Sequence, residues 1–140
     1  MGPRMGLVVL DSSVVIARMD DWHRNHQRAA RLLARITGHR VIHPITLAEC
    51  LVLPVKRGDN PEAMEGEILQ LLNARLATEA ELTANHSWVA KLAKTRVRSG
   101  LKMPDAIVLA TATILDGQVA SFDEGLRNNA AALGRLFQES

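Results

Sequence analysis

The sequence predicts an α/β fold with a central, mainly parallel sheet of four to five strands. Short runs that fit strands lie at 7–10, 40–44 and 118–122, and the first of them is apolar throughout, with the length and branching of a buried parallel strand. Each run is followed by a turn or a helix start, and alternation of strands with helices is typical of a parallel sheet covered by helices. A weaker strand pattern lies at 75–83, where the residues fit a loop equally well.

The first strand and the first two helices follow from local signals. Strand 7–10 is followed by Asp11 and then by two serines that offer a helix start. A second helix is expected from Asp21, a common N-cap residue, to the region of Gly38, which ends it. The expected apolar side of this helix consists of Ala29, Ala30, Leu32, Leu33 and Ile36.

The middle of the chain is expected to add two more helices. Pro44 closes the second strand, and a helix is expected to begin at Thr46. Further on, Asn60 as N-cap and Pro61 in the first helical position indicate the start of the next helix. Its expected buried face consists of Met64, Ile68, Leu71 and Leu72.

Two helices and a strand complete the expected fold. One helix is predicted from about Asn85 to Ser99, with Gly100 ending it, and another opens at Pro104 and continues through 106–115. The last strand, 118–122, follows. The first of these helices is predicted to bury Trp88, Val89 and Leu92.

Four carboxylates stand where a predicted strand ends or a predicted helix begins: Asp11, Glu49, Asp105 and Asp123. In an open α/β sheet these places converge on the crevice outside the carboxyl ends of the strands, where such folds bind their ligands. Each acid except Asp11 also has a structural explanation. Glu49 fits a capping box with Thr46, Asp105 complements a helix dipole, and Asp123 suits an N-cap.

A divalent cation is the simplest partner for this group of acids. Asp11 follows an apolar run and has no basic residue nearby in the sequence, so burying its carboxylate costs free energy unless something compensates the charge. No Cys or His cluster with metal-ligand spacing accompanies the acids, and ligand sets made only of oxygen favour hard ions. The sequence therefore predicts a site for Mg²⁺ or Mn²⁺.

Four segments together resemble the successive motifs of PIN-domain ribonucleases, and in particular the VapC toxins of bacterial toxin–antitoxin pairs. The most specific of them is Pro-Asp-Ala followed by a helix rich in small residues. The resemblance extends over roughly residues 7 to 126. The four segments are Leu-Asp-Ser-Ser-Val at 10–14, Thr-Leu-Ala-Glu at 46–49, Pro-Asp-Ala-Ile-Val-Leu-Ala-Thr-Ala at 104–112 and Ser-Phe-Asp-Glu-Gly-Leu at 121–126.

This resemblance implies a three-layer α/β/α fold and an acidic quartet made of the four carboxylates. Ser121 stands where a threonine is more usual in the family, and it keeps the hydroxyl group. The resemblance further implies an endonuclease that cuts RNA and that a cognate antitoxin protein blocks by occupying the acidic groove. Such proteins commonly form homodimers, and the apolar side of an early helix is a candidate contact.

The implied chemistry is metal-assisted hydrolysis of RNA phosphodiester bonds. Asp11 and Asp105 are expected to hold the principal Mg²⁺ or Mn²⁺, and Asp123 is expected to complete the shell directly or through water. Glu49 is expected to orient the attacking water or to support a second ion. A metal lowers the pKa of bound water, so no nucleophilic side chain is required.

Two stripes of basic residues are candidates for contact with RNA phosphates, although each also suits a solvated helix face. The second stripe leads into the segment that carries Asp105, so its members are the RNA-binding candidates. The first stripe consists of Arg24, Arg28, Arg31 and Arg35, and the second consists of Lys91, Lys94 and Arg98, followed by Lys102.

Length and composition agree with one small domain. With 140 residues, 47% of them hydrophobic, the chain can bury one core of ordinary size, so residues 1–140 are expected to form a single nuclease domain. Cys50 is the only cysteine, which rules out an intrachain disulfide and makes the reducing cytoplasm the expected location. The longest nearly apolar stretch, 106–115, is too short to cross a bilayer, so no membrane association is expected.

Two other classes of function fit parts of this pattern. Phosphate-transferring enzymes of the haloacid-dehalogenase or receiver type also place an aspartate after the first strand, but the former require Asp-x-Asp and this chain has Asp11-Ser12-Ser13. A catalytically silent PIN-like module would bind nucleic acid or a partner without binding Mg²⁺. Retention of all four acids favours the enzyme.

Overall fold

The computed structural model describes residues 6–84 and 87–139, and the strands within them form one sheet with β1 at its centre. The strand order is β3-β2-β1-β4, and every pair of neighbours is parallel. The carboxyl ends of all four strands therefore lie at the same edge of the sheet. The strands are β1 (Leu7–Leu10), β2 (His39–Ile42), β3 (Arg75–Leu76) and β4 (Gln118–Ala120).

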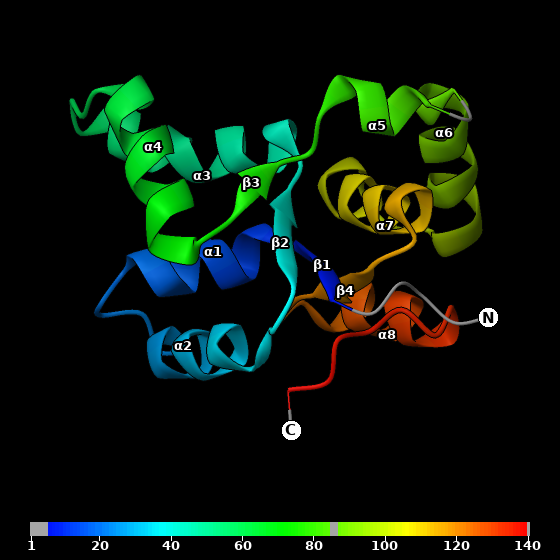
Figure 1. Cartoon of the computed structure of the whole chain (residues 1–140), viewed down its shortest axis with the longest axis horizontal. Helices are drawn as coiled ribbons and strands as arrows, with labels where there is room; N and C mark the ends of the chain where they lie inside the picture. Colours follow the sequence, from blue (N-terminus) through cyan, green and yellow to red (C-terminus); the bar gives the residue numbers. More distant parts are fainter. Residues whose placement is uncertain (1–5, 85–86, 140) are drawn as a thin grey trace.

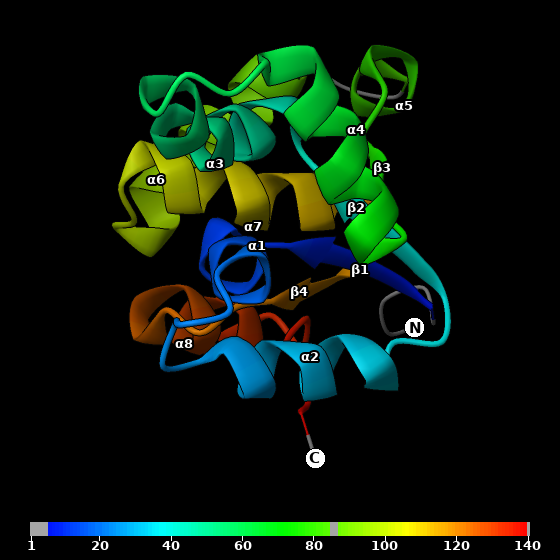
Figure 2. The ribbon, with the colours of Figure 1, turned by 90° about the vertical axis from the view of Figure 1, so that its left-hand side faces the viewer.

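Helices cover both faces of this sheet, so the molecule has the three-layer α/β/α arrangement that was expected (Figures 1 and 2). None of the helices in the described part of the chain is long and apolar enough to span a lipid bilayer. The helices are α1 (Ser12–Met19), α2 (His26–Arg35), α3 (Pro44–Lys56), α4 (Pro61–Leu72), α5 (Glu79–Thr83), α6 (Trp88–Ser99), α7 (Met103–Leu115) and α8 (Glu124–Ala132).

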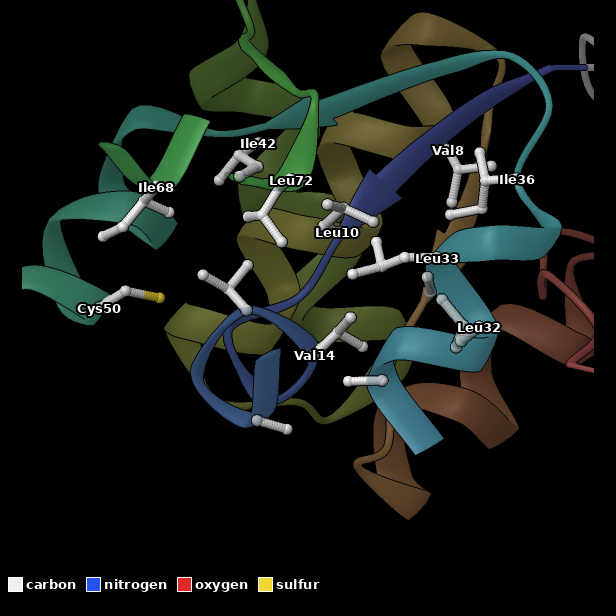
Figure 3. Packing of buried hydrophobic residues seen from close by; sticks show 14 of the residues in the cluster. Val8, Leu10, Val14, Leu32, Leu33, Ile36, Ile42, Cys50, Ile68 and Leu72 are labelled. Atoms are coloured by element: carbon white, nitrogen blue, oxygen red, sulfur yellow. The ribbon is translucent and has the colours of Figure 1, made fainter. Parts of the chain in front are cut away.

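The central strand supplies side chains to two separate cores, because successive residues of a strand point to opposite faces. Val8 and Leu10 pack with α1 to α4, as Figure 3 shows. Leu7 and Val9 pack with α5, α7 and α8 on the other face. Burying each large apolar side chain contributes roughly 1.5–3 kcal/mol to the free energy of folding. This two-sided burial fixes the position of the strand, and with it the position of Asp11.

A single arginine fixes the ends of two helices to the sheet. Arg40 of β2 donates from Nη1 to the carbonyl of Leu72 at 2.8 Å and from Nη2 to the carbonyl of Leu33 at 2.6 Å. These carbonyls lie in the last turns of α4 and α2, where a helix leaves its carbonyl groups without regular partners four residues on. The Leu33 carbonyl also accepts from the backbone N–H of Ile36 at 3.1 Å. The guanidinium group thus caps both helices, a role that the sequence pattern did not indicate.

The strand predictions are confirmed for β1 and are too long elsewhere. β2 ends at Ile42 because His43 already caps α3, and β4 ends at Ala120. The weak pattern at 75–83 contains only a two-residue strand. Its second half is helix α5, which begins with a capping box between Thr78 and Glu81.

The helix predictions are confirmed at some ends and wrong at others. Asn60 and Gly100 cap α4 and α6 as expected. Asp21 does not start α2, which begins at His26 after a turn, and Asn85 lies outside the described residues. Two side chains predicted to be buried, Leu71 and Val89, are exposed.

Candidate active site

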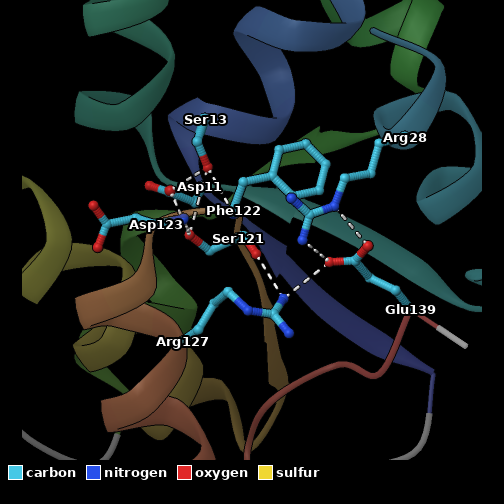
Figure 4. A network of polar contacts seen from close by, with 8 residues as sticks. All are labelled: Asp11, Ser13, Arg28, Ser121, Phe122, Asp123, Arg127 and Glu139. Carbon is cyan, nitrogen blue, oxygen red and sulfur yellow. Dashed lines mark hydrogen bonds and ion pairs between the residues drawn. The ribbon is translucent and has the colours of Figure 1, made fainter. Parts of the chain in front are cut away.

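Asp11 is the most strongly enclosed carboxylate of the site. It follows β1 directly, and only 3% of its surface is exposed. Although Asp11 occupies the N-cap position of α1, its side chain makes no capping hydrogen bond. Instead, its Oδ2 accepts hydrogen bonds from Ser13 Oγ at 2.7 Å and from Ser121 Oγ at 2.8 Å (Figure 4). Among the described residues no donor reaches Oδ1, so this oxygen stays available to a ligand.

The same two hydroxyl groups hold the loop between β4 and α8. Ser121 Oγ accepts from the backbone N–H of Asp123 at 2.9 Å, and Ser13 Oγ accepts from that of Phe122 at 3.0 Å. Each hydroxyl gives its one hydrogen to Asp11 and uses a lone pair for the loop. Two segments more than 100 residues apart are thereby locked together. The family resemblance singles out Ser121, whereas it includes Ser13 only as part of the segment 10–14 and gives it no role of its own.

Asp123 has a structural role as well as a place beside Asp11. It is the N-cap of α8, and its Oδ1 accepts from the backbone N–H of Leu126 at 2.9 Å. The N-cap explanation that the sequence allowed is therefore correct. This bond uses one carboxylate oxygen, and the side chain lies on the same side of the loop as Asp11 (Figure 4).

The pKa of Asp105 responds to the charges of the other three acids. Asp105 lies in the first turn of α7, and its pKa is raised to about 6. Burial contributes most to this increase, and the charges of Asp11, Asp123 and Glu49 add to it, while Lys102 opposes it. Each of the other three carboxylates is thus near enough to repel a negative charge on Asp105. We refer to these four residues as the acidic centre.

Glu49 lies further along its helix than the sequence indicated. α3 begins at Pro44, with His43 as its N-cap, because His43 Nδ1 accepts from the backbone N–H of Ile45 at 3.0 Å. Glu49 is therefore in the second turn, and the proposed capping box with Thr46 does not form. Burial and then the charge of Asp11 raise the pKa of Glu49. With its capping role removed, the position of Glu49 is better explained by the acidic centre.

The chemistry of the acidic centre fits a divalent cation. All four side chains offer carboxylate oxygens, and no Lys, Arg or His forms an ion pair with any of them within the described residues. Within residues 6–84 and 87–139, however, no three His, Cys, Asp or Glu side chains stand close enough together to hold a metal ion. No ion pair neutralises the negative charge of these acids in the described part of the chain, and a cation among them would remove their mutual repulsion.

The basic stripe proposed from the sequence lies elsewhere. Lys91, Lys94 and Arg98 line a groove of about 270 Å³ between α6, α7 and the end of α8. None of the four acids lines this groove. Contact of these three residues with RNA therefore stays a prediction. Lys102, in contrast, is near enough to act on the pKa of Asp105.

Cys50 is not a candidate nucleophile. It is buried next to Glu49 in α3, and burial raises the pKa of its thiol to about 12, with smaller contributions from the charges of Glu49 and Asp11. The reactive form of cysteine is the thiolate, which is nearly absent at neutral pH under these conditions. Cys50 instead belongs to the buried apolar cluster that α1 to α4 form with the sheet.

Comparison with known proteins identifies a family for nearly the whole chain. The family model of the PIN domain matches residues 8–132. This range contains all four residues of the acidic centre together with Ser13 and Ser121. No curated protein matches the sequence.

The raised pKa of Asp105 leads to a prediction about stability. In the folded protein Asp105 binds its proton more tightly than in the unfolded chain, so it lowers stability progressively as the pH rises from 3.8 to about 6. Asp105→Asn cannot ionise. In EDTA, the variant should therefore gain stability relative to the wild type over this range, reaching roughly 1 kcal/mol at pH 7 after allowance for solvent screening.

Urea unfolding of both proteins at several pH values measures this difference. Asp116→Asn, at the opposite end of α7, is the matched control, because the exposed Asp116 carboxylate pairs with Arg135 at 3.1 Å outside the acidic centre. A variant that is less stable than the wild type at every pH would mean that Asp105 serves mainly to stabilise the start of α7.

Proposed function

Because this chain belongs to the PIN domain family, we propose that it is a metal-dependent endoribonuclease that hydrolyses RNA phosphodiester bonds. PIN domains are generally nuclease modules that use divalent metal ions. The observation that carries the proposal is the gathering of four carboxylates at the edge of the sheet where the parallel strands end. Asp11 follows β1 and Asp123 follows β4, and the charges of Asp11, Asp123 and Glu49 all raise the pKa of Asp105. A carboxyl group with a strongly raised pKa, within a group of carboxylates at the ends of parallel strands, is typical of a catalytic site.

In this proposal Asp11, Asp105 and Asp123 hold Mg²⁺ or Mn²⁺. Asp11 is kept in place by two hydroxyl groups and presents its free Oδ1, while Asp123 keeps one oxygen after capping α8. When bound, the metal lowers the pKa of water and offsets the negative charge that develops on the phosphate. Glu49, the remaining acid, orients the attacking water or supports a second ion. Its raised pKa suits it to exchange a proton with that water.

We further propose that the enzyme is the toxin of a VapBC-type pair and acts in the cytoplasm. The resemblance of the four sequence segments to VapC toxins supports this assignment. A cognate antitoxin would block the acidic centre with a basic side chain, which the uncompensated charge favours. A short neighbouring gene that encodes a DNA-binding domain followed by an amphipathic segment is the expected finding. If the neighbouring genes encode nothing of this kind, a housekeeping nuclease is the better assignment.

A homodimer is the proposed assembly, and the exposed side of α3 is its proposed interface. Val52, Leu53 and Val55 are exposed on this helix. Leu53 also lines a pocket of about 380 Å³ together with Trp22, which is 95% exposed. Exposed apolar side chains that cluster in this way are typical of protein–protein interfaces.

Metal-dependent activity can be tested with one conservative substitution. Asp11→Asn keeps the size of the side chain and an acceptor for the two serine hydroxyls, but it removes one anionic ligand. RNA cleavage should fall by at least about a hundredfold, and EDTA should abolish cleavage by the wild type. Cleavage of a labelled RNA with Mg²⁺ or Mn²⁺ measures both effects.

Asp116→Asn serves again as the control, since it removes an aspartate charge outside the acidic centre. Asp116 has a φ angle of 54°, a left-handed conformation that asparagine tolerates well. This variant should cleave like the wild type. Undiminished cleavage by Asp11→Asn, or full activity in EDTA, would exclude the proposed mechanism.

The dimer proposal predicts a change of mass in solution. Leu53→Glu places a charge in the proposed interface and should convert the dimer to a monomer, as measured by light scattering after gel filtration. Leu133→Glu is the matched control, because Leu133 is also a leucine with 55% exposure but follows α8. A monomeric wild type, or a Leu53→Glu variant that stays dimeric, would contradict the proposed interface.

A further inference from the structure

Two adjoining pockets connect the acidic centre with the arginines before and on α2. The first, of about 330 Å³, is lined by Ser13 and Asp123 on one side and by Arg24 on the other. The second, of about 510 Å³, is lined by Arg24, Arg28 and Arg31. The two pockets share residues 23–25, so they form one continuous depression, which we call the α2 groove.

Arg24 enters this groove because of the turn that precedes α2. The sequence pattern placed Arg24 on the helix, but α2 begins only at His26. The backbone N–H of Trp22 donates to Asp20 Oδ1, and the N–H of Asn25 donates to His23 Nδ1, both at 3.0 Å. This turn brings Arg24 into the pocket that also contains Ser13 and Asp123. If residue 24 belonged to a regular helix, as the sequence pattern predicts, nothing would oblige Arg24 to lie beside Ser13 and Asp123.

The three arginines of the groove differ in how their charges are compensated. Arg28 donates to both carboxylate oxygens of Glu139, at 2.9 and 2.7 Å, and its guanidinium group lies 4.3 Å from the centre of the Phe122 ring (Figure 4). Arg127 binds the same carboxylate at 3.0 Å. Arg24 and Arg31 are exposed, and within residues 6–84 and 87–139 neither side chain has a hydrogen-bond or ion-pair partner.

Uncompensated guanidinium groups beside an acidic centre suit a polyanion that must reach that centre. A phosphate near the four carboxylates would be repelled unless cations nearby attract the strand. Arginine offers a planar pair of donors that matches two phosphate oxygens. A solvated helix face would explain Arg31, but it does not explain why Arg24 and Asp123 line one pocket.

We propose that Arg24 and Arg31 bind backbone phosphates of a single RNA strand that enters the acidic centre along the α2 groove. This inference rests on the proposed function, since it names the path of the substrate to the same site. Arg28 lines the groove between these two arginines, and its contacts with Glu139 and Phe122 fix the orientation of its guanidinium group. The groove of Lys91, Lys94 and Arg98 shares no residue with these pockets, and α6 lies on the other side of the sheet from α2 (Figure 2).

Binding of RNA without cleavage tests this path. The Asp11→Asn protein and its Arg24→Gln/Arg31→Gln derivative are titrated with a labelled single-stranded RNA in Mg²⁺ at several salt concentrations, with fluorescence anisotropy as the readout. Removing two phosphate contacts should reduce the slope of log affinity against log salt by about 1.4, from roughly 0.7 per contact. Arg28 is left intact because its removal would also leave Glu139 with fewer partners.

Two further derivatives complete the test. Arg24→Lys/Arg31→Lys keeps both charges and should keep the slope of the parent protein. Lys91→Gln/Lys94→Gln/Arg98→Gln removes three charges from the other side of the sheet. It should reduce the slope by less than Arg24→Gln/Arg31→Gln does. An unchanged slope for Arg24→Gln/Arg31→Gln, or a loss confined to the triple variant, would overturn the inference.

Failure of this inference can be told apart from failure of the proposed function. If the wild type cleaves RNA but Arg24→Gln/Arg31→Gln leaves the salt slope of RNA binding unchanged, the protein is a nuclease with a different substrate path. The opposite result is also possible: Arg24→Gln/Arg31→Gln reduces the salt slope as expected, but the wild type does not cleave RNA with any divalent ion. In that case the protein binds RNA along the α2 groove without being a nuclease.

Discussion

The burial of one carboxylate at the end of the central strand constrains the rest of this site. Asp11 is enclosed because β1 is buried on both faces, and a buried carboxylate must be hydrogen bonded or neutralised to be tolerated. Ser13 and Ser121 supply the hydrogen bonds to one of its oxygens. Through these hydroxyl groups the start of α1 and the loop before α8 hold fixed positions relative to β1. Asp123 is positioned as a consequence, since its backbone N–H binds the same Ser121 hydroxyl.

The acids of the molecule fall into two groups according to their surroundings. The pKa of Glu81 is lowered mainly by its hydrogen bonds with Arg75, and the pKa of Glu139 mainly by its hydrogen bonds with Arg28. The pKa values of Asp105 and Glu49 are raised instead, by burial and by neighbouring carboxylates. Acids of the first group stabilise the fold as ion pairs. Acids of the second group cost stability in the absence of a cation, which is the expected property of a site shaped for a ligand.

The sequence predicts the parts of this site that depend on local patterns. Asp11 and Asp123 could be placed because a strand precedes each of them. Asp105 could be placed because Pro104 indicates a first helical turn, although α7 begins one residue earlier, at Met103. The pattern places Glu49 one turn too early in its helix, because α3 has His43 as its N-cap and histidine is uncommon at that position. The pattern also starts α2 too early, at Asp21, because the side chains of Asp20 and His23 stabilise a turn in place of a first helical turn.

Contacts between distant segments could not be predicted from one sequence. Glu139 lies 111 residues from Arg28, and no periodicity connects the two. The exposed positions of Leu71 and Val89 depend on which neighbouring elements pack against α4 and α6, which the apolar pattern of a helix does not determine. The basic stripe on α6 is close to Asp105 in the sequence, yet it lines a groove with α7 and the end of α8, and none of the four acids lines that groove. The proposed path through the α2 groove depends on the turn around Arg24, and the sequence pattern predicts a helix there instead.

The most direct test of a metal site in the acidic centre is a crystal structure of the protein grown with Mn²⁺, with data collected to locate the ion by its anomalous scattering. We predict a peak bounded by the carboxylates of Asp11, Asp105 and Asp123, with these side chains drawn closer together than in the metal-free protein. Fully occupied Mn²⁺ at other places, with no peak among these carboxylates, would contradict the central claim that their shared charge is there to bind a cation.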